Sequence, residues 1–130
     1  MKPELQYLAW TTVLTALIWL PYVVDRTLVW GLTDTVGYPD APKPQTPWAR
    51  RMKAAHANAI ENLVVFATLV LVANAAGISN GTIVLAAQVY FWSRIVHLVA
   101  HTMGLPWVRT LAFTGGFVAQ MMVAWQILGR

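Results

Sequence analysis

Residues 50–76 decide the fold of this chain, and they read RRMKAAHANAIENLVVFATLVLVANAA. No proline or glycine interrupts them, so the polar first half and the apolar second half are predicted to form one helix. This helix places Asn58, Glu61 and Asn62 where a membrane-spanning segment begins. Ionisable groups at such a depth are costly and usually face a protein interior or a wet cavity. The stretch therefore predicts a polar site inside a small membrane bundle.

The composition of the whole chain is that of a membrane protein. Of its 130 residues, 58% are hydrophobic and only 11% are charged, whereas soluble domains carry about 25% charged residues. No cysteine is present, so the chain has neither a disulfide framework nor a thiolate nucleophile of its own. The net charge of +4 is modest, and the basic residues stand at segment ends, which argues against nucleic acid as a partner.

Hydropathy and helix-breaking residues predict an all-α integral membrane protein, a four-transmembrane-helix antiparallel bundle with a single domain over residues 1–130. The expected spans cover residues 5–24, 48–76, 82–102 and 107–128. The first span is close to the roughly 20 residues that a bilayer requires and lacks a small-residue cleavage signal, so we expect a retained helix. Pro21 is expected to kink it, and Asp25 with Arg26 to close it. Short turns make the last three spans antiparallel neighbours.

The distribution of basic residues predicts the orientation. The side that carries the long, Gly- and Pro-rich first loop and the turn between the last two spans holds Arg26, Lys43, Arg50, Arg51, Lys53 and Arg109. The opposite side holds Lys2 and Arg130. Because cytoplasmic loops carry the excess of Lys and Arg, the long loop is expected in the cytoplasm and both termini on the other side. We interpret the chain as an integral protein of a bacterial inner membrane.

Two of the expected helices each carry one polar stripe. Successive helical residues advance by about 100°. On that wheel an arc of roughly 100° in the second span contains Arg51, Asn58, Glu61 and Asn62, with His56 on the far side. An arc of roughly 60° in the third span contains Tyr90, Arg94, His97 and His101. Two such stripes in an apolar background are what a lined pocket requires.

The side chains in these stripes suit a small peptide-like ligand. Arg51, Arg94 and Arg109 can bind carboxylates in a bidentate manner. Glu61 can accept from an ammonium, and Asn58 offers both a donor and an acceptor. Arg109 opens the fourth span, where it can also stabilise an anion such as a thiolate. A ligand with carboxylates, an ammonium and peptide bonds matches this set.

A structural interpretation of the same residues stays open. Glu61 and Arg94 can pair across two helices, and Asn and His side chains form hydrogen bonds that hold membrane bundles together. The basic residues at the start of the second span are typical of snorkelling anchors. His97 and His101 have the i,i+4 spacing of metal ligands, but no carboxylate partner stands on their helix and no H-E-x-x-H motif is present, so we expect no metal.

Two segments carry a resemblance to a known family. The pattern A-H-x-N-x-x-E-N, from Ala55 to Asn62, resembles the second helix of the MAPEG family, the membrane-associated proteins in eicosanoid and glutathione metabolism. Residues 93–110, SRIVHLVAHTMGLPWVRT, are similar to the family's third helix and to the Gly, Pro and Arg that open its last helix. The resemblance covers all four spans in order and length. It implies a homotrimer of four-helix bundles that binds glutathione between subunits, near the cytosolic face.

Position by position, the resemblance implies a set of glutathione-binding residues. They are Arg51, Asn58 and Glu61 from the second helix, Arg94, His97 and His101 from the third, and Arg26 from the neighbouring subunit. Arg109 matches the arginine that stabilises the glutathione thiolate. The chain also departs from the pattern: His101 stands where many members have a glutathione-binding tyrosine, and Ala54 and Ala57 stand where some eicosanoid-forming members have arginines.

Two functions follow as hypotheses. The leading one is a membrane-bound glutathione-dependent transferase or peroxidase that acts on lipophilic electrophiles, with glutathione as cosubstrate and a lipophilic small molecule or lipid as the second ligand. The alternative is a non-enzymatic lipid-binding or scaffolding membrane protein of the same fold, since the family also contains a non-catalytic lipid-binding member. In that case the polar stripes serve the assembly of the trimer.

Overall fold

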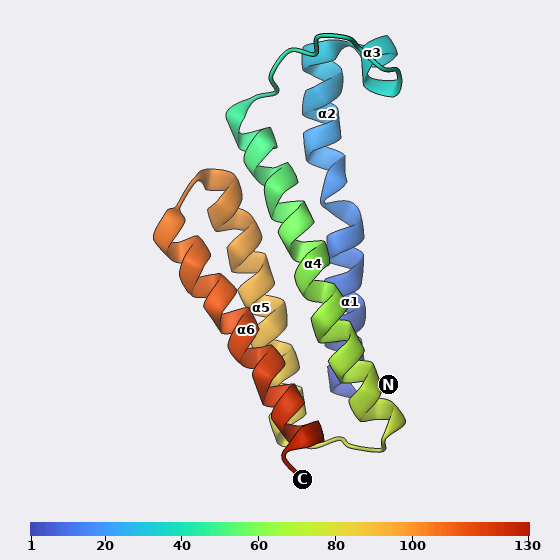
Figure 1. Cartoon of the computed structure of the whole chain (residues 1–130), viewed down its shortest axis with the longest axis vertical. Helices are drawn as coiled ribbons and strands as arrows, with labels where there is room; N and C mark the ends of the chain where they lie inside the picture. The colour runs from blue at the N-terminus through green and yellow to red at the C-terminus, as the bar shows by residue number, and fades with distance from the viewer.

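The computed structural model describes all residues, Met1–Arg130, as helices joined by connecting segments (Figure 1). The helices are α1 (Pro3–Leu17), α2 (Trp19–Trp30), α3 (Leu32–Val36), α4 (Pro47–Ala75), α5 (Gly81–Met103) and α6 (Pro106–Leu128). Four stretches are long and apolar enough to cross a membrane: Pro3–Trp30, Pro47–Ala75, Gly81–Met103 and Pro106–Leu128. The predicted all-α fold with four membrane-spanning helices is thereby confirmed.

The first spanning helix has a local break between α1 and α2. The break falls at Ile18, whose φ of −62° and ψ of −30° remain helical. Pro21 lies three residues further on and has no N–H, so it cannot donate to the carbonyl of Leu17 one turn earlier. The missing hydrogen bond accounts for the interruption without ending the helix. Neighbouring helices make such a proline tolerable in a membrane span.

The same helix ends later than the sequence predicted. Its end was expected after residue 24, but α2 continues to Trp30. Asp25 does not stop the helix because its carboxylate is buried and has partners across the loop: the Gln45 amide and the backbone and hydroxyl groups of Thr46 donate to it. Gly31 ends α2 instead, with a φ of +82° that favours glycine.

The long loop is fastened to α2. The indole N–H of Trp30 donates to the carbonyl of Lys43 at 2.6 Å. The Gln45 amide donates to the carbonyl of Tyr22 at 2.8 Å. Pro47 then begins α4 at the first helical position, where its missing N–H costs nothing. These contacts fix the start of α4, the helix with the polar stripe, relative to α2.

The larger of two apolar clusters lies in the half of the bundle that contains both termini (Figure 1). The rings of Phe66 and Tyr90, both fully buried, stack with their centroids 3.8 Å apart. Ala86 and Ala87 are also fully buried on α5, and small residues allow neighbouring helix backbones to approach closely. At the other end, α2, α3 and the start of α4 project beyond the turn between α5 and α6 (Figure 1). The core therefore leaves that end of α4, α5 and α6 free to form a site.

Candidate functional site

A polar recess lies where α4, α5 and α6 meet, at the end of the bundle away from the termini. It consists of two cavities. One has a volume of about 230 Å³ and is lined by Asn58, His97, His101, Arg109, Thr110 and Phe113. The other has a volume of about 180 Å³ and is lined by Arg51, His101, Gly104, Leu105, Pro106 and Arg109. The cavities share His101 and Arg109, so we treat them as one site and call it the recess.

α4 and α5 each present a pair of polar side chains to the recess. On α4 these are Arg51 and Asn58, at positions i and i+7. On α5 they are His97 and His101, at i and i+4, with ring centroids 5.5 Å apart and ring planes at 81°. Residues at these spacings lie on the same side of a helix. These four side chains, two from each predicted polar stripe, therefore line the same recess.

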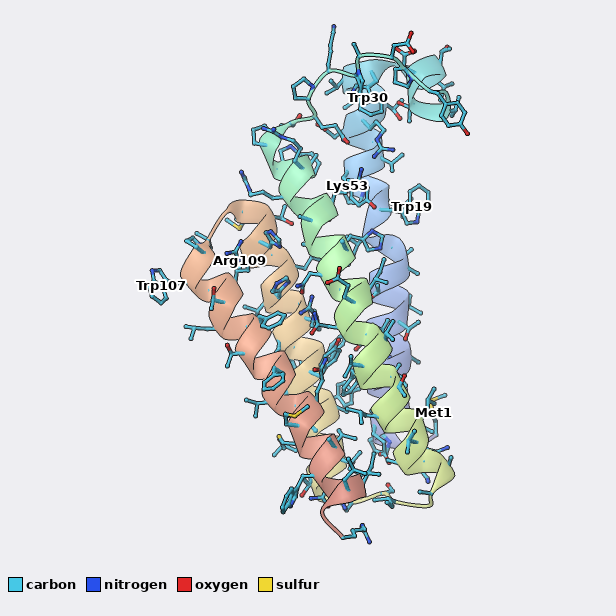
Figure 2. All side chains as sticks on the ribbon, viewed as in Figure 1. Met1, Trp19, Trp30, Lys53, Trp107 and Arg109 are labelled. Atoms are coloured by element: carbon cyan, nitrogen blue, oxygen red, sulfur yellow. The ribbon has the colours of Figure 1, made fainter.

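The turn between α5 and α6 sets the position of Arg109. Gly104 ends α5 with a φ of +75°, and the N–H of Leu105 donates back to the carbonyl of Ala100 at 2.8 Å. This is the left-handed glycine cap that satisfies the last carbonyls of a helix. Pro106 then starts α6, so Arg109 comes in its first turn. Figure 2 shows Arg109 close to this turn, whereas Trp107 points away from the bundle.

Arg51 reaches across from α4 to the end of α5. Its Nε donates to the carbonyl of Thr102 at 2.9 Å. The position that a Cβ atom on Gly104 would occupy lies 3.4 Å from the same Nε. A cation at a helix C-terminus is favourable, because the last carbonyls carry the negative end of the helix dipole. Arg51 is therefore held in place by α5 and lines the recess from there.

Arg94 lies buried beside the recess, with only 4% of its surface exposed. Its Nη2 donates to Oδ1 of Asn58 at 2.7 Å and contacts Nδ1 of His97 at 3.3 Å. Its Nε and Nη1 are buried and have no partner in the chain. A guanidinium remains charged in proteins, and a buried charge is costly unless it is paired. Arg94 thus orders two lining residues and keeps donors free for a further acceptor.

The polar stripe of α4 also reaches α6. The Asn62 amide donates to the backbone carbonyl of Asn58 at 2.9 Å, and the Gln120 amide donates to the carbonyl of Asn62 at 3.2 Å. Gln120 is buried in α6. Side-chain amides often link helices in this way inside membranes. These contacts fix the rotation of α4, with Asn58 facing α5 and Asn62 facing α6.

The sequence agrees with a family model over nearly its full length. The match covers residues 7–129 and is to the MAPEG family. The chain belongs to the MAPEG family. No curated protein matches it. Membership confirms the resemblance seen in the sequence and makes this chain a membrane protein of the glutathione and eicosanoid metabolism group.

Two of the candidate site residues of this MAPEG chain neither line the recess nor bond to a residue that lines it. Glu61 is exposed on α4 and lines neither cavity. The guanidinium of Arg94 bonds to Asn58 and His97 and not to this carboxylate. Arg26 lies on α2, where its Nε donates to the Gln45 side chain at 3.4 Å and its guanidinium covers the Trp30 ring at 5.1 Å. The structure of one chain therefore does not bring Glu61 or Arg26 to the other residues.

Other residues of the site were missed in the sequence. Thr110 and Phe113 line the recess from α6, and the Phe113 ring lies 6.4 Å from that of His97. The signal for Phe113 was present, since a residue at i+4 from Arg109 shares its side of a helix. Thr110, at i+1, is turned by about 100° from Arg109, so the spacing gave no signal for it. Gln120 had a weaker signal, a lone amide in an apolar span. All three residues stand on the fourth span, for which the sequence predicts no polar stripe.

Proposed function

We propose that this MAPEG chain is a membrane-bound, glutathione-dependent transferase or peroxidase that acts on lipophilic electrophiles. The observation that carries the proposal is the charge of the recess. Its lining includes Arg51 and Arg109 and contains no carboxylate. A concave site lined by one sign of charge attracts the opposite sign, and arginine binds carboxylates with two parallel hydrogen bonds. Glutathione brings two carboxylates and, once ionised, a thiolate.

In this proposal the recess holds the anionic parts of glutathione as cosubstrate. Arg51 and the free donors of Arg94 bind carboxylate oxygens. Asn58 and His97 bind peptide groups, and His101 lies beside them. Arg109 sits next to the sulfur, where its guanidinium favours the thiolate, which is the reactive form. The thiolate then attacks a lipophilic electrophile that enters from the lipid phase, and a bond from sulfur to the electrophile forms as the electrophile's leaving bond breaks.

We further propose that the chain works as a homotrimer with the long loop in the cytoplasm. The exposed Glu61 supports a neighbouring chain, because an uncovered carboxylate on a membrane helix is costly. In such an assembly Glu61 meets the ammonium of glutathione at a subunit boundary, and Arg26 reaches the recess of the next subunit. The basic residues at the loop end support the orientation, which lets glutathione enter from the cytoplasm.

A second function is favoured by a different observation. An apolar cavity of about 420 Å³ follows the outer side of α6 and the start of α5, and it is lined by Thr82, Phe117, Val118, Met121, Met122, Trp125 and Gln126. Its lining suits an acyl chain or another lipophilic molecule. A non-enzymatic lipid-binding or scaffolding protein of the same fold would use this surface and leave the recess to structural hydrogen bonds.

One experiment separates the two functions. The detergent-solubilised protein is heated with and without glutathione, and conjugation of a chromogenic electrophile is followed in the same preparations. A ligand that binds only the folded state must raise the Tm, so the transferase proposal expects both stabilisation and turnover. S-methylglutathione, which keeps the carboxylates and lacks the ionisable thiol, should stabilise without turnover. Stabilisation by lipid alone, with neither effect from glutathione, would favour the second function.

A further inference from the structure

The two histidines of the recess differ in the ring nitrogen that they can offer. Nδ1 of His97 lies 3.3 Å from Nη2 of Arg94. An arginine side chain only donates hydrogen bonds, so Nδ1 must accept and the ring proton must be on Nε2. His97 is buried to 3% exposure but lines the recess. It is therefore fixed as a donor towards the recess and has no free basic nitrogen there.

His101 has the opposite arrangement. Its Nδ1 is buried without a partner, while the residue lines both cavities of the recess. Nε2 is thus the ring nitrogen that is open to the recess. The side-chain oxygen of Asn58 already accepts from Arg94, and the Thr110 hydroxyl donates to the carbonyl of Pro106 at 2.8 Å. Among the lining side chains, His101 is left as the one base that can take a proton.

We propose that His101 is the proton acceptor for the thiol in this recess and that His97 is a fixed hydrogen-bond donor beside it. The inference rests on the proposed function and assigns its acid–base group. An arginine can stabilise a thiolate but cannot accept the proton that ionisation releases. A histidine within reach of the sulfur can do so, and it can return the proton to the leaving group.

The proposed step balances as follows. The S–H bond of the thiol breaks, and its proton moves to Nε2 of His101 to give a thiolate and an imidazolium. The thiolate forms a bond to the electrophilic carbon, and the electron pair of the bond that breaks goes to the leaving oxygen, for example that of an opened epoxide. The imidazolium returns its proton to that oxygen. No further oxidant or reductant takes part.

The charges around His101 couple its protonation to the formation of the thiolate. The charged and titratable groups around the ring are Arg51 on α4, Arg94 and His97 on α5, and Arg109 on α6. All three charged neighbours are cations, so an isolated imidazolium is unfavourable among them. A thiolate that forms beside it supplies the compensating negative charge. We therefore expect imidazolium and thiolate to appear together when the thiol binds.

The decisive measurement compares the amount of thiolate formed with the number of protons released to the solution. Glutathione is mixed with the detergent-solubilised parent protein in weak buffer, and the thiolate is followed by its ultraviolet absorbance while a pH indicator follows protons in solution. Transfer to His101 predicts thiolate without an equivalent release of protons. One proton released for each thiolate would show that the proton leaves the site, and it would overturn the inference. This measurement uses the parent protein and does not depend on a variant that folds.

Two variants give the kinetic test. His101→Gln should lower kcat by about 10²- to 10⁴-fold, the usual contribution of a positioned acid–base group. Its rate should keep rising to higher pH than the parent's rate, because the thiol must then lose its proton to the solvent with only Arg109 to favour the thiolate. His56→Gln is the matched control, because His56 bonds to the Tyr22 hydroxyl at 2.8 Å and lines neither cavity. It should keep the rate and the pH profile of the parent.

The experiments distinguish a failure of this inference from a failure of the proposed function. If the parent turns over but His101→Gln changes only KM, or keeps the rate and pH profile of the parent, His101 is a binding residue and this inference is wrong while the proposed function stands. If the parent shows no thiol-dependent turnover with several electrophile classes, the proposed function fails and this inference fails with it. Partial recovery of a His101→Ala variant by added imidazole would support the inference, since a structural defect would not respond to a soluble base.

Discussion

Two substitutions of Asn58 are expected to affect the stability of the protein and ligand binding in the recess to different extents. In the parent, Oδ1 of Asn58 accepts from Nη2 of Arg94 at 2.7 Å, and Nε and Nη1 of the same guanidinium have no partner in the chain. Asn58→Ala leaves the buried cation with only the contact to His97 at 3.3 Å. A hydrogen bond to a charged group contributes about 1.5–3 kcal/mol, so we expect the free energy of unfolding to fall by about that amount.

Asn58→Asp is the informative partner variant. It keeps an acceptor at the same place and adds a charge opposite to that of Arg94. We expect it to unfold at or above the Tm of the alanine variant, because truncation leaves the cation unpaired while aspartate pairs it. Glutathione binding should become weaker, since a carboxylate in the recess repels an anionic ligand. For Asn58→Asp, the loss of stabilisation by glutathione should therefore exceed the loss of stability without ligand.

The assay is thermal or denaturant unfolding in one detergent, with and without glutathione, for the parent and both variants. Thr68→Ala is a matched control on the exposed side of α4, where the Thr68 hydroxyl donates only to the carbonyl of Val64 in its own helix. Equal stability of parent and Asn58→Ala would refute the assignment of Asn58 as the partner of Arg94. Undiminished glutathione stabilisation of Asn58→Asp would refute the placement of an anion in the recess.

The other predictions concern the thiolate, the assembly and the topology. Arg109→Ala should reduce turnover far more than it weakens glutathione binding, and Arg109→Lys should recover only part of the rate because lysine lacks the planar fork; equal turnover and pH dependence in the alanine variant would count against this role. Native mass spectrometry in mild detergent should find a homotrimer, and a stable monomer that still binds glutathione would contradict a site shared between subunits. Glu61→Gln should weaken glutathione binding much more than His56→Ala does, and equal losses would remove Glu61 from the site. Reporter fusions should place the C-terminus on the non-cytoplasmic side, and a cytoplasmic C-terminus would reverse the proposed orientation.

The fold was predictable from the sequence because a membrane permits few kinds of fold. Only helices and closed barrels satisfy their backbone groups in lipid, and the apolar runs here are of helical length. Glycine and proline mark the turns, as Gly104 and Pro106 do between α5 and α6. The sequence predicts too early an end for α2 because Asp25 and Arg26 interrupt the apolar run. Asp25 is a helical residue whose carboxylate is held by the loop, and a contact of that kind is not visible in one-dimensional hydropathy.

The site was predictable only as far as single helices allow. A helical wheel gives the angle between residues of one helix, and it placed Arg51 with Asn58 and His97 with His101. It does not give the rotation of a helix against its neighbours, which here follows from the bonds of Asn62 to Gln120 and of Asn58 to Arg94. That rotation leaves Glu61 exposed, although it is only about 60° from Asn58 on the wheel.

The position of Glu61 bears directly on the assembly. Glu61 stands where the apolar run of α4 begins, so an uncompensated carboxylate there costs less than the roughly 2.5–3.5 kcal/mol of a charge at the centre of a span. Within this chain the guanidinium of Arg94 bonds to Asn58 and His97 and not to Glu61. Because the apolar run of α4 begins directly after Glu61, solvation at the membrane interface is one way to compensate the charge. A partner chain or a bound ammonium is the other way, and removing the carboxylate distinguishes the two. If Glu61→Leu strengthens the monomer's resistance to unfolding while it abolishes trimer formation and glutathione binding, the carboxylate is kept for assembly and ligand. If Glu61→Leu leaves all three unchanged, the charge is solvated in the single chain and the proposed intersubunit role is wrong.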